Sequence, residues 1–317
     1  MSVSSRGSCV FAFLVGFSTI GCTQNLPVPV VRFPPKAPGR YHERLYVGGL
    51  NRTYILRVPQ EYDGSRPLPL VVVLHGLSGS ADGADANTGM GDEASKEGFI
   101  LVAPEGTGDQ PLHGWNAGFF NMTGVDVNDV QFIESLINKI QSEVGVDEDR
   151  IYVAGHSNGA FLAHLLGSRL SKRIAAIAAV SGTIGVPDRD GGMKIIPKPT
   201  EPVSALIIHG KQDPMVQYDS RSPALLHDVG AMDSARFWAR NDGCSMTPRE
   251  TRSPDGNIIT DTFSGGRNGT EVTLVSIVNG THDWPGGYSR SGWETRSGIR
   301  AASLIWEFFK SHPKRRS

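Results

Sequence analysis

The sequence predicts an α/β fold with a mostly parallel central sheet and helices on both faces. Two patterns and the composition support this. Short apolar, β-branched runs, such as residues 68–74, alternate with segments whose apolar side chains recur every three or four residues. Continuous apolar runs are typical of strands that are buried on both faces of a parallel sheet. The 317 residues are 39% hydrophobic and contain no internal repeat, which indicates one large domain.

The first elements follow this alternation. Residues 44–59 predict an opening hairpin of two short strands about a Gly-Gly pair. Residues 68–74 form the first buried strand, and a loop rich in Gly, Ser and Asp follows it. A helix is expected near residues 91–97, and residues 99–104 form the next strand.

The later elements continue the pattern. Residues 130–144 carry a helical stripe made by Phe132, Ile133, Leu136, Ile137 and Ile140. The remaining expected strands are residues 151–154, 174–180, 205–208 and 272–278, and the remaining expected helices are residues 160–170, 231–240 and 299–310. Residues 185–200 and 249–266 are expected to be excursions from the fold rather than a second domain.

The N-terminal segment predicts export. Arg6 is followed by an apolar stretch, residues 10–20, which is too short to span a bilayer and suits a signal peptide over residues 1–21. Two interpretations of its processing remain open. Thr19-Ile20-Gly21-Cys22 resembles a bacterial lipobox that would place a lipid on Cys22, whereas ordinary cleavage nearby would release a soluble secreted or periplasmic protein.

A proline-rich segment follows, and the remaining chain is one domain. Residues 22–40 contain five prolines between positions 27 and 38, which predicts an extended linker. Residues 41–317 then form the catalytic domain. The net charge of −1 leaves no basic field to attract nucleic acid. Three cysteines cannot make a disulfide framework. No histidine pair has zinc-ligand spacing near Cys or carboxylate ligands, so no metal is expected, and no cofactor is expected either.

A serine between glycines is the first candidate catalytic residue. Residues 155–159, Gly-His-Ser-Asn-Gly, match G-x-S-x-G between a predicted strand and a predicted helix. The small flanking residues allow a turn so sharp that the Ser157 hydroxyl is raised above the sheet, and the following helix begins beside it. We therefore expect Ser157 to be a nucleophile.

The candidate acid and base follow later strands. In this fold class the order along the chain is Ser, acid, His, and each residue lies on a loop after a strand. Asp213 follows the strand at residues 205–208, and His282 follows the last strand. Asp219 and Asp283 are competing carboxylates, but Asp219 lies further from the strand end and Asp283 adjoins the histidine, which is poor geometry for orienting its ring.

The predicted oxyanion hole uses two backbone N–H groups. One belongs to Asn158, the residue after the nucleophile. The other belongs to Leu77, in the loop after the first buried strand, where Gly76 allows the backbone to turn inward.

These motifs together resemble the secreted esterases grouped with feruloyl esterases, acetylxylan esterases and polyhydroxybutyrate-depolymerase-like proteins. The resemblance covers roughly residues 44–313 and implies an α/β-hydrolase fold and hydrolysis of carboxylic esters. Many relatives carry cysteines after the Trp-Asn segment where this chain has residues 119–121, so Cys244 is expected to be a free, buried thiol. The matching segments are residues 74–76, 114–118, 126–130, 155–159, 209–213 and 282–286.

Two tryptophans are candidate substrate-binding residues. Trp115 and Trp284 flank loops expected above the sheet, where they would form a wall for an aromatic or sugar-bearing group. The alternative is that both only pack loops. We expect small soluble esters, free or linked to polysaccharide, to be the substrates. A peptidase or thioesterase on the same scaffold, or a tethered binding protein without catalysis, remain alternatives.

Overall fold

The computed structural model describes residues 33, 36–121, 123–187, 190, 192–219, 229–288 and 298–315. The chain divides between Val31 and Arg32, and the fold given below is that of the second unit, Arg32–Ser317. The predicted signal peptide, Cys22 and most of the predicted linker lie outside the described residues. Among the helices of the described part, none has the length and apolarity needed to cross a membrane.

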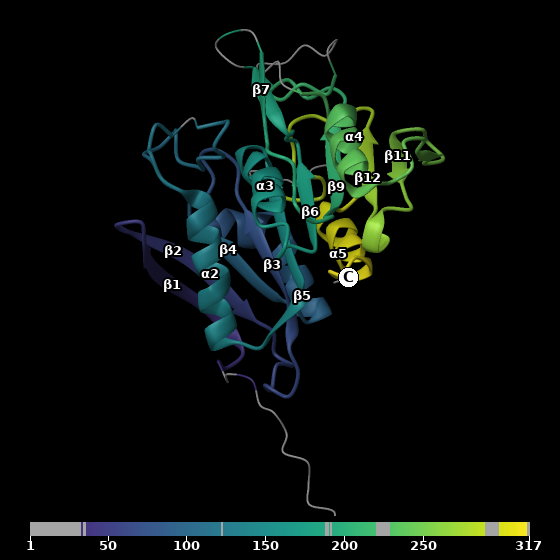
Figure 1. Cartoon of the computed structure of the whole chain (residues 1–317). Coiled ribbons are helices and arrows are strands. Elements are labelled where there is room, and N and C mark those ends of the chain that lie inside the picture. The colour runs from purple at the N-terminus through teal and green to yellow at the C-terminus, as the bar shows by residue number, and fades with distance from the viewer. Residues whose placement is uncertain are drawn as a thin grey trace, which may run out of the picture. The chain divides into compact units, whose positions relative to one another are not determined.

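A ten-stranded sheet forms the centre of this unit, and most of its strands are labelled in Figure 1. The strands from β4 to β12 in the sheet order run parallel, and antiparallel strands extend both edges. The predicted mostly parallel sheet is therefore confirmed. In spatial order the strands are β1 (Gly39–Val47), β2 (Leu50–Val58), β4 (Ile100–Pro104), β3 (Leu68–Leu74), β5 (Val146–His156), β6 (Ala176–Val180), β9 (Ser204–Gly210), β12 (Val272–Ile277), β11 (Ile258–Phe263) and β10 (Arg249–Arg252).

Helices cover both faces of the sheet, because alternate residues of each central strand point to opposite sides. Leu70 and Val72 belong to a core cluster with α2 (Asp129–Glu143), α3 (Asn158–Arg169) and α4 (Ala231–Asp242), which Figure 1 shows in front of the sheet. Val71 and Val73 belong to a second cluster, which includes residues of α1 (Met90–Glu97) and α5 (Ala301–Ser311). Shorter helical turns lie at η1 (Gly83–Asn87) and η2 (Arg267–Gly269).

The two expected excursions contain strands. Residues 185–200 include the small hairpin of β7 (Gly185–Pro187) and β8 (Met193–Ile195), and residues 249–266 include β10 and β11. The strands β8 and β10 are exposed at every residue, so they lack the apolar runs by which a buried strand is recognised in a sequence.

The described end of the predicted linker contacts the domain rather than standing away from it. The Phe33 N–H donates to the Gly64 carbonyl oxygen at 2.9 Å. The Lys36 ammonium donates to Glu143 at 2.8 Å and also pairs with Glu43. The Phe33 side chain lies so close to Gly145 that a Cβ there would be 2.5 Å from it. An extended spacer is therefore wrong for Phe33 and Lys36, because the Phe33 side chain and these polar contacts bind this segment to the domain.

Candidate active site

Ser157 lies in a sharp turn between β5 and α3. Its backbone has φ 52° and ψ −118°, a conformation that L-residues rarely adopt. A Cβ on Gly155 would lie 2.2 Å from the Gly159 carbonyl oxygen, and one on Gly159 would lie 2.5 Å from the Leu74 carbonyl oxygen. Both positions therefore require glycine, and the turn raises the Ser157 hydroxyl at the carboxyl end of the parallel strands.

Three predicted side chains come together at this edge. The Ser157 hydroxyl donates to His282 Nε2 at 2.8 Å, and His282 Nδ1–H donates to Asp213 Oδ2 at 2.8 Å. Asp213 follows β9 and His282 follows β12, which are neighbours in the sheet, so their loops meet beside the turn that carries Ser157. The competing carboxylate Asp283 instead accepts a hydrogen bond from the Thr281 hydroxyl.

Asp213 is a buried carboxylate held in place by several donors. Its Oδ1 accepts the N–H groups of Met215 at 2.8 Å and Val216 at 2.9 Å. His209 Nε2 lies 3.4 Å from Oδ2 and donates to the Val216 carbonyl oxygen at 3.1 Å. Burial alone would raise the pKa of Asp213, but the hydrogen bonds from His209 and His282 hold that pKa well below its ordinary range. Asp213 is therefore ionised beside His282. The local sequence gives no sign of this contact between His209 and Asp213.

His156, directly before the nucleophile, is a buried neutral ring. Burial, together with the nearby His282, lowers the pKa of His156 to about 3. The centres of these two rings are 5.2 Å apart. A neutral His156 adds no positive charge beside His282, so it does not oppose formation of the His282 cation during a reaction.

The two predicted oxyanion-hole groups are close to Ser157. Asn158 is the first residue of α3, and Gly76 precedes Leu77 in the loop after β3. A Cβ on Gly76 would lie 3.3 Å from the Ser157 Cβ, so this loop passes directly over the nucleophile. Within the described residues, the N–H groups of Leu77 and Asn158 have no hydrogen-bond acceptor. Both are thus available to a substrate oxygen.

The loop after β3 is held by a second loop. The Ser78 N–H donates to the His113 carbonyl oxygen at 2.7 Å, and His113 Nδ1–H donates to the Gly79 carbonyl oxygen at 3.2 Å. The Ala81 N–H donates to Glu105 at 2.9 Å. These contacts fix the backbone on which Leu77 lies.

Trp115 does not form the predicted wall of a substrate pocket. Its side chain is 0% exposed, and its Nε1–H donates to the His75 carbonyl oxygen at 2.9 Å. Its N–H donates to Asn158 Oδ1 at 2.7 Å, and Asn158 Nδ2 donates back to its carbonyl oxygen at 3.2 Å. Loop packing, the alternative role, is what the structure shows, because Trp115 lies beneath the site and joins α3 to the loop after β4.

Trp284 does line a cavity next to the reacting groups. This cavity has a volume of about 480 Å³ and lies between the loop after β3 and the loop that carries His282. Trp284 is only 7% exposed, so it offers little surface to a ligand. The other lining residues are His75, Gly76, Leu77, Ser78, Gly79, Ser80, Gly83, Ala84, Asn87, Thr88, His156, His282, Asp283 and Tyr288.

A buried ion pair supports the Trp115 segment from behind. Arg52 on β2 and Asp129 at the start of α2 are 2.8 Å apart, and their side chains are 4% and 0% exposed. Asp129 Oδ2 also accepts the Asn116 N–H at 2.8 Å. Burial raises the pKa of Asp129 above its ordinary value, although the Arg52 charge opposes this. Asn128 is the N-terminal cap of α2, because its side chain accepts the Gln131 N–H at 3.0 Å.

Sequence reasoning missed the role of Arg52. Its only sign in the sequence is spacing, because position 52 has the parity of Tyr54 and Leu56, which point into the core. Asp129, the first residue of α2, lies inside the protein, between Arg52 and the Asn116 backbone.

One group of possible metal ligands occurs among the described residues, at His75, Glu105 and His113. Each histidine nitrogen that faces Glu105 Oε1 lies 3.5 Å from it. Both nitrogens already make backbone hydrogen bonds, because His75 Nε2 accepts the Gly106 N–H and His113 Nδ1–H donates to Gly79. The group therefore has a structural use without an ion, and the absence of a metal stays a prediction.

Cys244 is a free thiol buried beneath the loop after η2. Its Sγ lies 3.8 Å from the Thr270 carbonyl oxygen. Burial raises the pKa of Cys244 to about 11, which leaves it protonated and poorly reactive near neutral pH. The predicted free, buried thiol is confirmed.

Comparison with known proteins relates this chain to esterases. Residues 53–191 match the family model described as Esterase PHB depolymerase. Feruloyl esterase C of Emericella nidulans is 27% identical over 283 residues, which cover 86% of this chain and 90% of that protein. Feruloyl esterase B of Piromyces equi is 28% identical over 248 residues, covering 77% of this chain but only 44% of that protein, so the chain spans less than half of its length.

Solved structures share the fold. Acetyl xylan esterase from Aspergillus awamori superposes with a TM-score of 0.57 at 14% identity, covering 85% of this chain and 99% of that one. The ferulic acid esterase of Anaeromyces mucronatus gives 0.53 at 17% identity, covering 87% and 91%. The α/β-hydrolase fold and the predicted resemblance to feruloyl, acetylxylan and depolymerase-like esterases are confirmed. The relatives support a carboxylic ester hydrolase of this type.

Proposed function

We propose that this α/β-hydrolase, similar to feruloyl and acetyl xylan esterases, is a serine esterase that acts through an acyl-enzyme. The observation that carries the proposal is the hydrogen-bond chain from Ser157 through His282 to Asp213, beside two N–H groups without acceptors among the described residues. The substrates proposed are feruloyl or acetyl esters of sugars, or short hydroxyalkanoate esters, either as small molecules or linked to a polysaccharide.

The first half of the reaction forms the acyl-enzyme. Ser157 Oγ attacks the ester carbonyl carbon while His282 Nε2 takes its proton. The negative oxygen that develops receives hydrogen bonds from the N–H groups of Leu77 and Asn158. Asp213 holds His282 with its proton on Nδ1 and stabilises the cation. His282 then protonates the leaving alcohol as the ester C–O bond breaks.

The second half releases the acid. A water molecule gives a proton to His282 Nε2 and attacks the acyl carbon bound to Ser157. The same two N–H groups stabilise the second oxyanion. His282 returns the proton to Ser157 Oγ, which leaves the free carboxylic acid and the starting enzyme.

The cavity beside Ser157 supports compact substrates. Its volume of about 480 Å³ is at the small end of ligand pockets, which are commonly about 300–1,000 Å³. A feruloyl or acetyl group suits such a space better than a long acyl chain. Trp284 provides an apolar contact for the acyl group.

The decisive experiment compares matched substrates with the Ser157→Ala variant as control. Initial rates are measured on methyl ferulate, p-nitrophenyl butyrate, a long-chain triglyceride, solid polyhydroxybutyrate, a thioester and an amide. We expect the small esters to be hydrolysed best, and Ser157 to be labelled by a serine-directed phosphonate. A preference for the amide or the thioester would favour a peptidase or thioesterase. Failure of the phosphonate to label the folded protein would favour a binding protein without catalysis.

We also propose that residues 1–21 direct export, to the periplasm or outside the cell, and that residues 41–317 are the catalytic domain. A lipid on Cys22 would tether this domain to a membrane through the proline-rich linker. Mass spectrometry of the mature N-terminus, for the natural chain and for Cys22→Ser, separates a lipidated cysteine from ordinary cleavage. An unprocessed N-terminus in the exporting host would contradict the signal peptide.

A further inference from the structure

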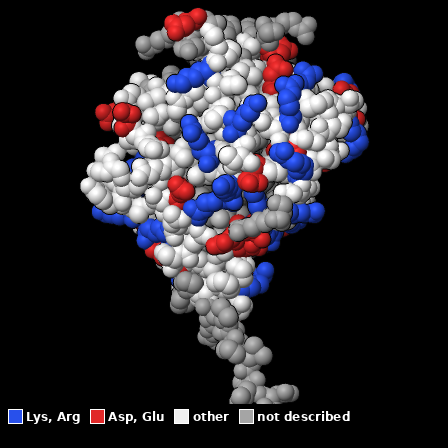
Figure 2. Space-filling view, viewed as in Figure 1, with Lys and Arg blue, Asp and Glu red and all other residues white. Residues whose placement is uncertain are grey.

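Basic side chains gather on the face of the sheet that α3 and α4 cover. Figure 2 shows several Lys and Arg side chains over the middle of this face, with acidic side chains beside some of them. The net charge of the chain is only −1, so this is a local concentration rather than a general property. Such a surface attracts anions before contact and holds them after it.

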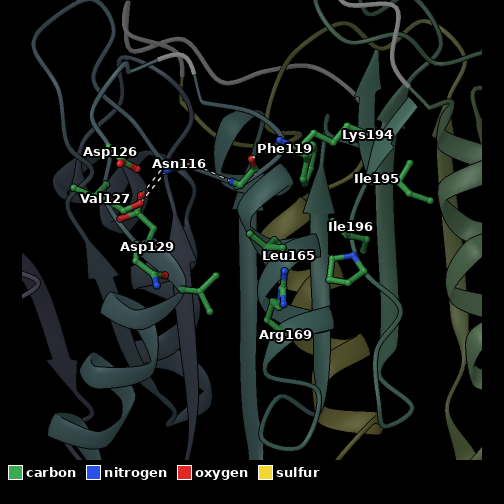
Figure 3. Close-up of a pocket in the computed structure, with 14 residues that line it drawn as sticks. Asn116, Phe119, Asp126, Val127, Asp129, Leu165, Arg169, Lys194, Ile195 and Ile196 are labelled. Atoms are coloured by element: carbon green, nitrogen blue, oxygen red, sulfur yellow. Dashed lines mark hydrogen bonds between the residues drawn. The ribbon is translucent and has the colours of Figure 1, made fainter. Parts of the chain in front are cut away.

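The first hollow on this face lies between α2, α3 and β8 and has a volume of about 750 Å³ (Figure 3). Figure 3 shows Asp126 and Asn116 on one side, Lys194 and Ile195 on the other, and Leu165 between them. Two cations line it, Arg169 at the end of α3 and Lys194 on β8. Its other charged lining residues are Asp126 and Asp129, and Asp129 is already neutralised by Arg52.

The second hollow has a volume of about 800 Å³ and adjoins the first, because Ile195 and Ile196 line both. Its carboxylate is Asp233 of α4. Its apolar floor includes Ile184 and Phe237. Four cations surround this floor, namely Lys198, Arg236, Arg240 and Arg267.

Most of these cations are not neutralised by the described part of the protein. Arg236 lies 3.4 Å from Asp233, its neighbour one helical turn away, and that exposed pair is weak. The side chains of Arg169, Lys198 and Arg240 make no hydrogen bond or ion pair with the described residues. Arg267 donates to the Asn241 carbonyl oxygen, which carries no charge. The hollows therefore present charges that an anionic ligand can pair with.

We propose that these two hollows bind the main chain of an acidic polysaccharide, one whose sugar units carry carboxylates, while Ser157 cleaves an ester on it. This rests on the function proposed above. Sugar rings have apolar C–H faces that suit the apolar lining made by Ile195, Ile196 and Phe237. Their carboxylates accept paired hydrogen bonds from the arginines at the rim.

The position of α3 connects this surface to the reaction. Asn158 begins α3 beside Ser157, and Arg169 ends it, so the helix spans about 16 Å at about 1.5 Å per residue. The loop at Asn116 and Gly118 lines the first hollow and directly follows Trp115, which is bonded to Asn158. A polymer lying in the hollows therefore keeps its ester groups near Ser157.

Binding is tested on the Ser157→Ala protein, so that hydrolysis plays no part. Its mobility is measured in native gels containing polygalacturonate, neutral arabinoxylan or no polymer. The test variant adds Lys198→Gln, Arg236→Gln and Arg240→Gln. The matched control adds Arg66→Gln, Lys96→Gln and Lys310→Gln, which remove the same charge from exposed positions, two of them on the α1 and α5 face.

We expect polygalacturonate, but not arabinoxylan, to retard the Ser157→Ala protein and the control variant. The test variant should bind about tenfold more weakly. Salt at about 1 M, which shortens the Debye screening length to about 3 Å, should abolish the retardation. Equal retardation of test and control variants, or none of the Ser157→Ala protein, overturns the proposal. So does binding of the protein to vesicles of phosphatidylglycerol and phosphatidylcholine without binding to the polymer, which would make this face a membrane surface.

A kinetic arm separates this proposal from the proposed function. With Ser157 present, the same three substitutions should raise the KM for acetylated polygalacturonate about tenfold and leave kcat and the hydrolysis of p-nitrophenyl acetate unchanged. Unchanged KM for the polymer contradicts the docking surface while leaving the esterase intact. If the natural protein hydrolyses none of the esters, the proposed esterase function is contradicted. The gel measurement still tests whether the protein binds the polymer.

Discussion

The ion pair behind the active site offers a quantitative test of the fold. Replacing Arg52 by Met keeps much of the side-chain volume but leaves Asp129 buried without its cation. Removing one partner of a buried pair costs about 3–5 kcal/mol, because the remaining charge has lost its compensation. Arg52 also donates to the Glu105 carbonyl oxygen at 3.1 Å and lies 4.0 Å from the Phe132 ring centre, so its loss falls at the upper end.

The companion variant removes both charges. When Arg52→Met is combined with Asp129→Asn, the oxygen of the new side-chain amide still accepts the Asn116 N–H, and neither charge of the pair is left. A neutral replacement of a buried pair is often almost without cost, so the free energy of unfolding should recover by about 2 kcal/mol or more relative to Arg52→Met.

Urea unfolding followed by tryptophan fluorescence and circular dichroism measures both variants. The midpoint should fall clearly for Arg52→Met and recover in part for the double variant, with the m value unchanged. Initial rates on p-nitrophenyl butyrate show whether the loss reaches the Asn158 backbone through Trp115. The reasoning is refuted if Arg52→Met lies within about 1 kcal/mol of the natural protein, or if the double variant is no more stable than the single one.

Three further outcomes are expected. Ser157→Ala should lower kcat by about 10⁶ without changing the unfolding midpoint, and near-normal turnover by the folded variant would contradict the nucleophile. Burial lowers the pKa of His75, His156 and His164 to about 3 or 4. Below their ordinary pKa of about 6.5, only the unfolded chain takes up protons at these rings, so the free energy of unfolding falls as the pH falls. Asp242, whose pKa burial raises to about 7, and Asp129, whose pKa burial also raises, act in the opposite sense and reduce this fall without reversing it. An unfolding midpoint that does not change between pH 7 and pH 5 would contradict this balance. EDTA should leave the melting temperature and the rate unchanged, and a clear loss of either would reveal a structural ion.

Local patterns in the sequence were enough for the central architecture. The apolar runs at residues 68–74 and 205–208 predicted β3 and β9, because strands covered on both faces must be apolar at every position. Ser157, Asp213 and His282 could be chosen because each lies in the turn or loop that follows such a strand. Parallel strands end at the same edge of a sheet, so residues after them meet there without further information.

Edge strands could not be recognised in this way. The sequence of β10, Arg-Glu-Thr-Arg, is polar and fully exposed, and only its pairing with β11 makes it a strand. The hairpin of β7 and β8 likewise depends on its own cross-strand bonds. No apolar period marks these segments, because they bury little surface against the core.

The surroundings of the site depended on contacts between segments distant in the chain. Trp115 is apolar enough for a pocket wall or for the interior, and its bonds to His75 and Asn158, 40 and 43 residues away, put it inside. Arg52 and Asp129 are of charged types that usually lie at the surface. They are buried because each compensates the charge of the other. Periodicity in the sequence specifies which face of a strand or helix is apolar. Which distant side chain fills the space or neutralises the charge on that face is decided only when the elements pack together.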